Sequence, residues 1–167
     1  MNISIEPVKI EEKEILQNLS ELYIYELSQY SPIDVNDMGL YDDLDDLDLY
    51  WIEENRYPFF IKVDNKYAGF LLVYDGRQLE EIQSNYTLDE FFVLYKYKQQ
   101  GVGKYCAEYI FDKFKGKWQI WFHPRNTVAG KFWAKAISEY TKGKFELKKN
   151  TVPYYDGTIG NTFVFDS

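Results

Sequence analysis

The chain has 167 residues and almost no cysteine or histidine, with one residue of each, Cys106 and His123. A single thiol cannot form an internal disulfide, and one thiol with one imidazole cannot supply the four ligands of a structural zinc site. We therefore expect neither a disulfide framework nor a bound metal. The five prolines and ten glycines form no linker, and no segment repeats, so the sequence predicts one domain over residues 1–167.

Long apolar runs and positive charge are also scarce. No stretch approaches the roughly 18 consecutive apolar residues of a membrane span, and the first residues lack the basic and apolar parts of a signal peptide. We expect a cytoplasmic protein. The 19 Lys and Arg are outnumbered by 27 Asp and Glu, which gives a net charge of -8. This charge disfavours nucleic acids and anionic membranes as partners and favours a neutral or cationic one.

Aromatic side chains, in contrast, are abundant and make up 19% of the chain, within a hydrophobic content of 46%. This composition is typical of a folded globular core. Apolar periodicity and turn residues predict strands over 3–8, 57–63, 67–74, 88–95, 118–122, 145–147 and 162–165, and helices over 11–28, 40–51, 101–114 and 126–142. The order predicts a single mixed α/β domain, with a central twisted mixed sheet flanked by about four helices. The helix that starts at Gly101 is the expected crossover between parallel central strands.

The segment from 93 to 104 carries the clearest chemical signal, because it leads from a buried strand through a basic loop into a helix that opens with two glycines. The first N–H groups of a helix have no internal partner and, with the positive end of the helix dipole, bind anions. Gly101 and Gly103 allow the backbone to approach phosphate oxygens closely. The alternative is that the two glycines only let strand and helix pack closely. The predicted diphosphate-binding residues are Lys98, Gln99, Gln100, Gly101, Val102, Gly103 and Lys104.

The same segment carries a family resemblance. Residues 98–103 resemble the [Arg or Gln]-x-x-G-x-[Gly or Ala] signature of the GNAT superfamily of acyl-CoA N-acyltransferases, with Lys98 at the first position. A second signature of that family, roughly N-x-x-A-x-x-x-Y-x-K-x-G-F, is matched at Asn126, Ala129 and Lys135. Trp133 stands where Tyr is expected, and the final Gly-Phe is not matched. The predicted order of helices and strands fits the family over nearly the whole chain, so a GNAT-like fold is expected.

The resemblance implies an N-acetyltransferase that moves an acetyl group from acetyl-CoA to a primary amine of a small molecule or peptide, by direct attack in a ternary complex. It implies that the thioester oxygen lies near the backbone of Val93 and Leu94. It also implies that Asn126 contacts the pantetheine arm or anchors the loop after the fifth strand. The acceptor is not identified. The sequence does not decide whether the protein forms a homodimer. The alternative function is a catalytically weak acyl-CoA-binding sensor or interaction module.

Glu90 is the predicted general base of such a reaction. An alkylammonium acceptor has a pKa of about 10, so it must lose a proton before its nitrogen attacks a thioester. Glu90 lies in an otherwise apolar stretch just before the diphosphate loop, and burial makes a carboxylate a better base. The alternative places Asp89 and Glu90 at the exposed start of the strand, where they only keep its edge soluble.

The proton donor for the departing thiolate is less clear. Many GNAT enzymes use a Tyr at the position of Trp133, which has no acidic hydroxyl and is predicted to lie in the core. His123 could relay a proton, or it is a loop histidine without a catalytic task. Cys106 is expected to be a buried, inert thiol. The tyrosines that could replace the missing acid are Tyr140, Tyr154 and Tyr155.

An acidic run falls in the predicted second helix, next to the expected acceptor site. Such a cluster would attract a polyamine, an aminoglycoside or a basic peptide. The alternative is a solvated helix face with no ligand. The run consists of Asp42, Asp43, Asp45, Asp46 and Asp48.

Overall fold

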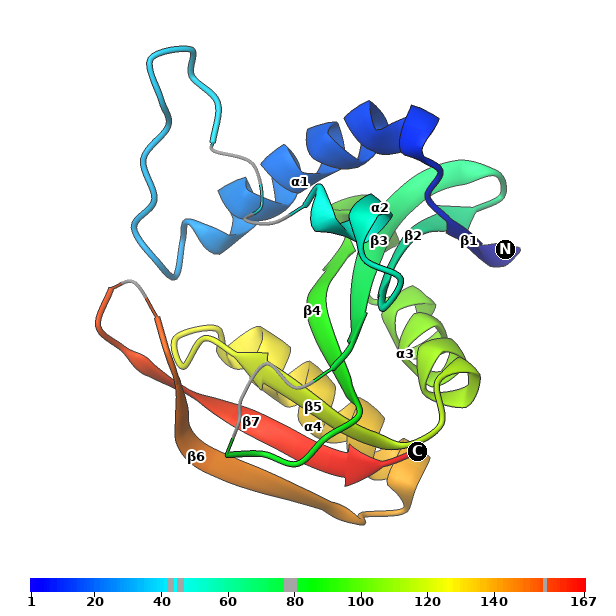
Figure 1. Ribbon diagram of the computed structural model, residues 1–167, viewed down its shortest axis with the longest axis vertical. Helices are drawn as coiled ribbons and strands as arrows, with labels where there is room; N and C mark the ends of the chain where they lie inside the picture. The colour runs from blue at the N-terminus through cyan, green and yellow to red at the C-terminus, as the bar shows by residue number, and fades with distance from the viewer. Residues whose placement is uncertain (42–43, 45–46, 77–80, 155) are drawn as a thin grey trace.

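The computed structural model describes residues 1–41, 44, 47–76, 81–154 and 156–167 (Figure 1). Its strands are β1 (Ile3–Pro7), β2 (Arg56–Val63), β3 (Lys66–Asp75), β4 (Tyr86–Val93), β5 (Lys117–Phe122), β6 (Phe145–Pro153) and β7 (Ile159–Asp166). Its helices are α1 (Lys13–Leu27), α2 (Leu49–Ile52), α3 (Val102–Lys113) and α4 (Thr127–Thr141), with short 3-10 turns η1 (Ile10–Glu12) and η2 (Tyr95–Tyr97).

The seven strands form one sheet in the order β1-β2-β3-β4-β5-β7-β6. Neighbouring strands are antiparallel except β4 and β5, which run parallel and are joined by the α3 crossover. β4 and β5 pair at their first residues, Tyr86 with Trp118 and Thr87 with Gln119, and then diverge (Figure 1). Within the described strands, the ladder between them stops at Thr87, so the sheet opens along β4 from Leu88 onward.

Helices cover both faces of the sheet (Figure 1). On one face, α3 and α4 bury apolar side chains such as Ile110 and Ile137 in the larger of two hydrophobic clusters. On the other face, α1 and α2 bury Leu16 and Tyr50 against β2, β3 and β4. The apolar residues recur at helical spacing, which gives each long helix one face toward the sheet.

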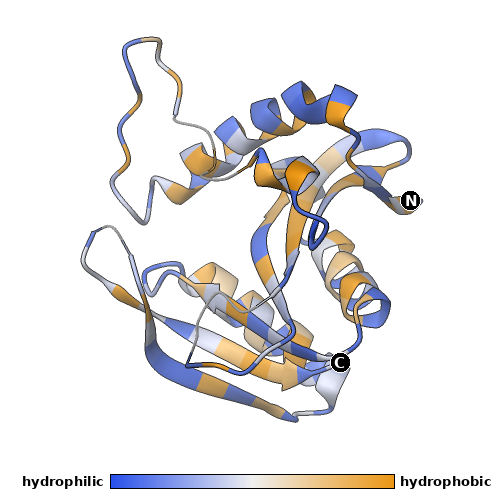
Figure 2. Cartoon of the chain, viewed as in Figure 1, coloured by the Kyte–Doolittle hydropathy of each residue, from blue (hydrophilic) through white to orange (hydrophobic). Residues whose placement is uncertain are grey.

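The outer strand β6 is largely hydrophilic (Figure 2). Lys148 and Lys149 lie on this strand, at the edge of the sheet. Charged side chains on an edge strand oppose pairing with another chain. Among the described residues, no helix has the length and apolar character needed to cross a membrane.

The predicted fold class is confirmed, and so is the hairpin of β2 and β3. Its turn residues Asp64 and Asn65 have positive φ angles of 47° and 62°, the conformation that a tight two-residue hairpin requires. The expected parallel pair across α3 is also confirmed. The last two strands are longer than the predicted 145–147 and 162–165, because alternating polar residues continue the ladder on an edge that faces water.

The predicted helix over 40–51 is wrong in length. Among the described residues, the structure has only the four residues of α2 there. Residues 47–48 before it form a turn, and 42–43 and 45–46 lie outside the described residues. Aspartate is a poor helix former, and neighbouring carboxylates repel one another at helical spacing. Of the acidic run, Asp48 alone is described, and its carboxylate pairs with Lys13.

Candidate active site

A β-bulge in β4 places two neighbouring carboxylates on the same face of the sheet. Leu72 of β3 pairs with Glu90, and the next pair joins Val73 to Leu88, so Asp89 is the extra residue of the bulge. The Tyr23 hydroxyl donates a hydrogen bond of 2.5 Å to Glu90 Oε2. On the same face, the Tyr50 hydroxyl donates to Asp89 Oδ2, also at 2.5 Å. Glu90 thus lies in the middle of β4, half-buried, rather than at the exposed start of a strand.

Three tyrosines around Glu90 hold their protons firmly. Burial raises the pKa of Tyr23 well above its usual value, and the Glu90 charge and the hydrogen bond from Tyr23 raise it further. Burial and the Asp89 charge raise the pKa of Tyr50 in the same way. The pKa of Tyr154, which follows β6, is also raised by burial and by the Glu90 charge. All three therefore stay protonated, and Tyr23 and Tyr50 donate hydrogen bonds.

His123, directly after β5, is buried and joined to the turn between β6 and β7. Its Nδ1 accepts the Arg125 backbone N–H at 3.1 Å, so its proton lies on Nε2. Nε2 lies 3.0 Å from Thr158 Oγ1 and 3.3 Å from Asp156 Oδ2. The Thr158 hydroxyl, its backbone N–H and His123 together lower the pKa of Asp156 to about 2. Both ring nitrogens are engaged with the protein, which supports a structural role for His123.

These contacts hold Tyr154 next to His123 and bring a third segment to the same place. The Tyr154 ring packs edge-on against the His123 ring, with centroids 4.6 Å apart. Arg125 Nη1 lies 3.2 Å from the Tyr30 carbonyl oxygen, beyond the end of α1, and 3.2 Å from Asp156 Oδ2. The end of α1, the loop after β5 and the β6–β7 turn therefore meet around Arg125.

The turn before α3 has the form expected of an anion site. Gly101 precedes the helix with a φ of +83°, and no atom lies within 4 Å of the place that a Cβ would take. Gly103 differs, because a Cβ there would lie 3.2 Å from Phe132 and 3.7 Å from Phe91. The open space at Gly101 fits close approach of a phosphate, whereas Gly103 fits the alternative of close packing.

The lysines predicted for the diphosphate site are engaged with carboxylates. The Lys98 ammonium pairs with both oxygens of Glu26 on α1. Lys104 pairs with Glu139 of α4 at 2.5 Å and with Glu108 at 3.7 Å. Along the same loop, the Gln100 side chain donates to the Lys96 carbonyl, and Gln99 has a positive φ of 59°. Val102 is fully buried, so it can offer only its backbone to a ligand.

The remaining predicted residues lie along the opening between β4 and β5. Val93 ends β4, and the Leu94 N–H donates to the Ala68 carbonyl. Asn126 caps α4, since its Oδ1 accepts the Ala129 N–H at 2.9 Å. The structure thus shows Asn126 as the N-cap of α4, at the end of the loop after β5.

Two of the other candidates lie in the core. Trp133 is buried and contacts Phe91 edge-on at 5.1 Å. Cys106 is fully buried, and burial raises the pKa of its thiol to about 12, so it is inert as a nucleophile.

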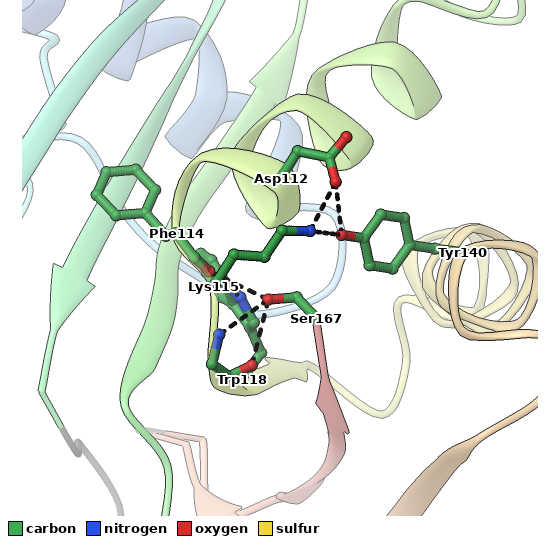
Figure 3. Close-up of polar contacts among 7 residues, drawn as sticks. Asp112, Phe114, Lys115, Trp118, Tyr140 and Ser167 are labelled. Carbon is green, nitrogen blue, oxygen red and sulfur yellow. Dashed lines mark hydrogen bonds and ion pairs between the residues drawn. The ribbon is translucent and has the colours of Figure 1, made fainter.

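The Tyr140 hydroxyl binds other residues. It is bound to Asp112 and Lys115, on the side of the molecule where the C-terminus meets α3 (Figure 3). Of the two described tyrosines that could replace the missing acid, Tyr154 is the one whose pKa the Glu90 charge raises; Tyr155 lies outside the described residues.

A sequence model of the Acetyltransferase (GNAT) family matches residues 19–137. The chain belongs to this family. The GNAT match begins in α1 and ends in α4, so it includes Glu90, the Gly101 turn and Asn126. No curated protein matches the chain.

Solved GNAT structures share the fold over the whole chain. An acetyltransferase from Thermus thermophilus has a TM-score of 0.72 at 15% identity, over 100% of this chain and 98% of that one. The ribosomal-protein-S18-alanine N-acetyltransferase from Escherichia coli has 0.57 at 14% identity, over 99% and 94%. A spermidine N-acetyltransferase chimera from Vibrio cholerae and hSSAT has 0.62 at 10% identity, over 98% and 94%. Such low identities show the GNAT fold and leave the acceptor to be argued from the site.

Sequence reasoning missed the partners of the predicted GNAT residues. Tyr23 and Glu26 fall within the predicted 11–28 helix, and nothing in the sequence indicates that they bind Glu90 and Lys98. Asp156 and Thr158 carried no signal at all, because a single Asp and Thr in a turn are common. A tyrosine on an otherwise apolar helix face was the one available hint, since a buried hydroxyl needs a partner.

Proposed function

We propose that this GNAT acetyltransferase moves an acetyl group from acetyl-CoA to a primary amine, and that Glu90 accepts the amine's proton. The observation that carries the proposal is the position of Glu90 at the bulge of β4, beyond the point where the ladder to β5 stops. Along the chain, Glu90 is followed directly by the end of β4 and the Gly101 turn. The chain thus carries a proton acceptor and an anion-binding turn on one short segment.

The open space at Gly101 supports acetyl-CoA as the donor. A side chain at this position would project into that space, and the first amides of α3 are available to phosphate oxygens there. The residues proposed to hold the cosubstrate are Val93, Leu94, Lys98, Gln99, Gln100, Gly101, Val102, Gly103, Lys104 and Asn126. When bound, acetyl-CoA supplies an acetyl group already activated as a thioester.

The chain's own residues then have a limited task. Glu90 takes a proton from the ammonium group, directly or through water, so that the amine becomes nucleophilic. The missing tyrosine at Trp133 slows turnover without preventing it, since a thiol with a pKa of about 8.5 is already a fair leaving group. Tyr154 is a weak acid, because burial and Glu90 raise its pKa, and it serves better as a hydrogen-bond donor.

The charges around the site support a cationic acceptor. The Glu90 carboxylate faces the side of the sheet that α1 and α2 cover, and Asp156 lies in the turn next to Tyr154. An ammonium group is favoured in such surroundings over a neutral or anionic one. The spermidine N-acetyltransferase chimera among the structural neighbours makes polyamines a reasonable first choice. Peptide N-termini are the second, given the alanine N-acetyltransferase.

The experiment is an acetyl-CoA-dependent assay with a panel of amines: spermidine, a simple alkylamine, lysine and a peptide with a free N-terminus. Release of the CoA thiol is followed with a thiol reagent, to which the buried Cys106 contributes little background. We expect Glu90→Gln to lower kcat by about a hundredfold, the lower range for loss of a general base, and to leave acetyl-CoA affinity unchanged. Asp89→Asn, at the neighbouring carboxylate, is the matched control and keeps most of the activity.

A specific observation favours the second function, an acyl-CoA-binding sensor: Trp133 replaces the usual tyrosine and is packed into the core. Tight acetyl-CoA binding without turnover of any amine in the panel would support that function and contradict the first. Equal activity of Glu90→Gln and the unaltered chain would leave the acetyltransferase reaction standing and remove Glu90 as its base.

A further inference from the structure

Tyr23 is fixed in place by contacts that a solvent-exposed tyrosine would not have. Its ring lies edge-on to Phe70, with centroids 5.7 Å apart, and tilted against Phe92 at 5.6 Å. Phe70 is fully buried and Phe92 nearly so. Two immobile rings from β3 and β4 therefore hold the Tyr23 ring, and its hydroxyl has little freedom to move.

The bond from this hydroxyl to Glu90 has a fixed direction. Tyr23 stays protonated across the usable pH range, so it donates and Glu90 accepts, at 2.5 Å. A donor of this kind stabilises the ionised form of a carboxylate over the protonated one. It also fixes the rotation of the carboxylate, since one of its two oxygens is held.

The groups that face Glu90 come from several elements. They are Tyr23 on α1, Tyr50 on α2, Tyr154 after β6 and the neighbouring Asp89 on β4. The bond from Tyr50 goes to Asp89, which also lies 3.8 Å from Arg56 Nη1. Arg56 is bound in turn to Glu53 at 2.6 Å, so Asp89 belongs to an ion-pair network that joins α2 to the sheet.

We propose that Tyr23 is a positioning residue for the acetyl transfer: its hydroxyl holds Glu90 ionised and correctly rotated to accept the proton of the amine. The proposal rests on the proposed function of Glu90. Tyr50 makes the same bond to the adjacent carboxylate without serving the reaction. The chain thus contains two tyrosine–carboxylate pairs of equal length on neighbouring residues, one for the chemistry and one for the fold.

The test compares Tyr23→Phe with Tyr50→Phe in the whole chain, with the best amine of the panel. We expect Tyr23→Phe to lower kcat about tenfold, with KM for the amine and acetyl-CoA affinity within about twofold of the unaltered chain. Without the donor, Glu90 is protonated more readily, so the acidic limb of the pH profile of kcat/KM moves up by about one pH unit. We expect Tyr50→Phe to lower stability and leave that limb in place.

Two outcomes overturn the proposal while Glu90 keeps its role: an unmoved acidic limb in Tyr23→Phe, or an equal movement in Tyr50→Phe. The pH profile of kcat/KM for Glu90→Gln distinguishes failure of the Tyr23 proposal from failure of the proposed role of Glu90. If that variant retains full activity and the same limb, Glu90 is not the base, and the role of Tyr23 falls with it, while the acetyltransferase reaction stands. Should Tyr23→Phe not fold, Tyr23→Met removes the hydroxyl with a smaller, flexible apolar side chain that adapts to the space, and the same shift is expected of it.

Discussion

Two glycines of this chain have almost the same φ angle, and both have open space beside them. Gly101 precedes α3 with a φ of +83°, and Gly143 follows α4 with a φ of +80°. At both positions, no atom lies within 4 Å of an added Cβ. Alanine at either place has to adopt the left-handed conformation, at a cost of about 1 kcal/mol. The two substitutions are therefore matched in backbone cost, and only one is at the proposed diphosphate turn.

We expect Gly101→Ala to weaken acetyl-CoA binding about tenfold, or ~1.4 kcal/mol, because its methyl group takes space that the phosphate oxygens need. Gly143→Ala should bind acetyl-CoA like the unaltered chain, although both variants lose a similar few degrees of Tm. Isothermal titration calorimetry measures the affinity, and thermal unfolding without ligand measures the shared cost. Equal affinities for the two variants would place the diphosphate elsewhere.

At the residue scale, sequence predicted what depends on local structure. The position of Gly101 at the turn before α3 follows from the preference of glycine for turns. The burial of Cys106 and Trp133 follows from helical periodicity. The pairs that surround the site do not follow, because their members are far apart along the chain. Tyr23 and Glu90 are separated by 67 residues, and Glu26 and Lys98 by 72. Only the three-dimensional packing of α1 on the sheet brings them together.

Among the elements, α1 is the one that connects the two proposed parts of the site. Tyr23 and Glu26 are three residues apart and so share one helix face, from which one binds Glu90 and the other binds Lys98. Beyond the helix end, the Tyr30 carbonyl accepts a bond from Arg125. Any shift of α1 therefore moves Tyr23, the partner of Glu90, and Glu26, the partner of Lys98, together.

The Glu26–Lys98 pair gives a prediction at this scale. Glu26→Gln removes the charge that neutralises Lys98, so we expect acetyl-CoA to bind about threefold more tightly, a modest gain because the pair is partly exposed. In the Lys98→Met background, the same change should have no effect, and calorimetry on all four chains completes the cycle. Glu139→Gln, which releases Lys104 in the same manner, is the comparison. A gain from Glu26→Gln that persists in Lys98→Met would contradict the role of Lys98.

Element predictions succeeded where periodicity was regular and failed where it was interrupted. The crossover helix α3 and the β2–β3 hairpin follow from apolar spacing and from turn residues. The predicted 40–51 helix followed leucines at suitable spacing and ignored the aspartates between them, which disfavour a helix. The sequence of β4 does not indicate the bulge at Asp89, because the bulge arises from the pairing of β4 with β3.

Across the whole molecule, charge is divided along the chain. Residues after 90 contain 13 of the 19 Lys and Arg but only 6 of the 27 Asp and Glu. The basic part holds the proposed diphosphate loop and α4, whereas the acidic part holds α1, α2 and the carboxylates of β4. A polyanionic cosubstrate and a cationic acceptor would each meet the part of the chain with the opposite charge. The net charge of -8 hides this division, because it is a sum over both parts.

Added salt should therefore weaken the binding of both substrates, although they carry opposite charges. Raising NaCl from about 50 to about 300 mM shortens the range of electrostatic attraction, so KM should increase for acetyl-CoA and for a multiply charged amine such as spermidine. A singly charged alkylamine serves as the control, because its attraction to the acidic part is weaker and its KM should change less. Initial rates at several salt concentrations, with kcat monitored separately, measure the three slopes. Equal slopes for spermidine and the alkylamine would mean that the acidic part of the chain does not recognise the acceptor by its charge.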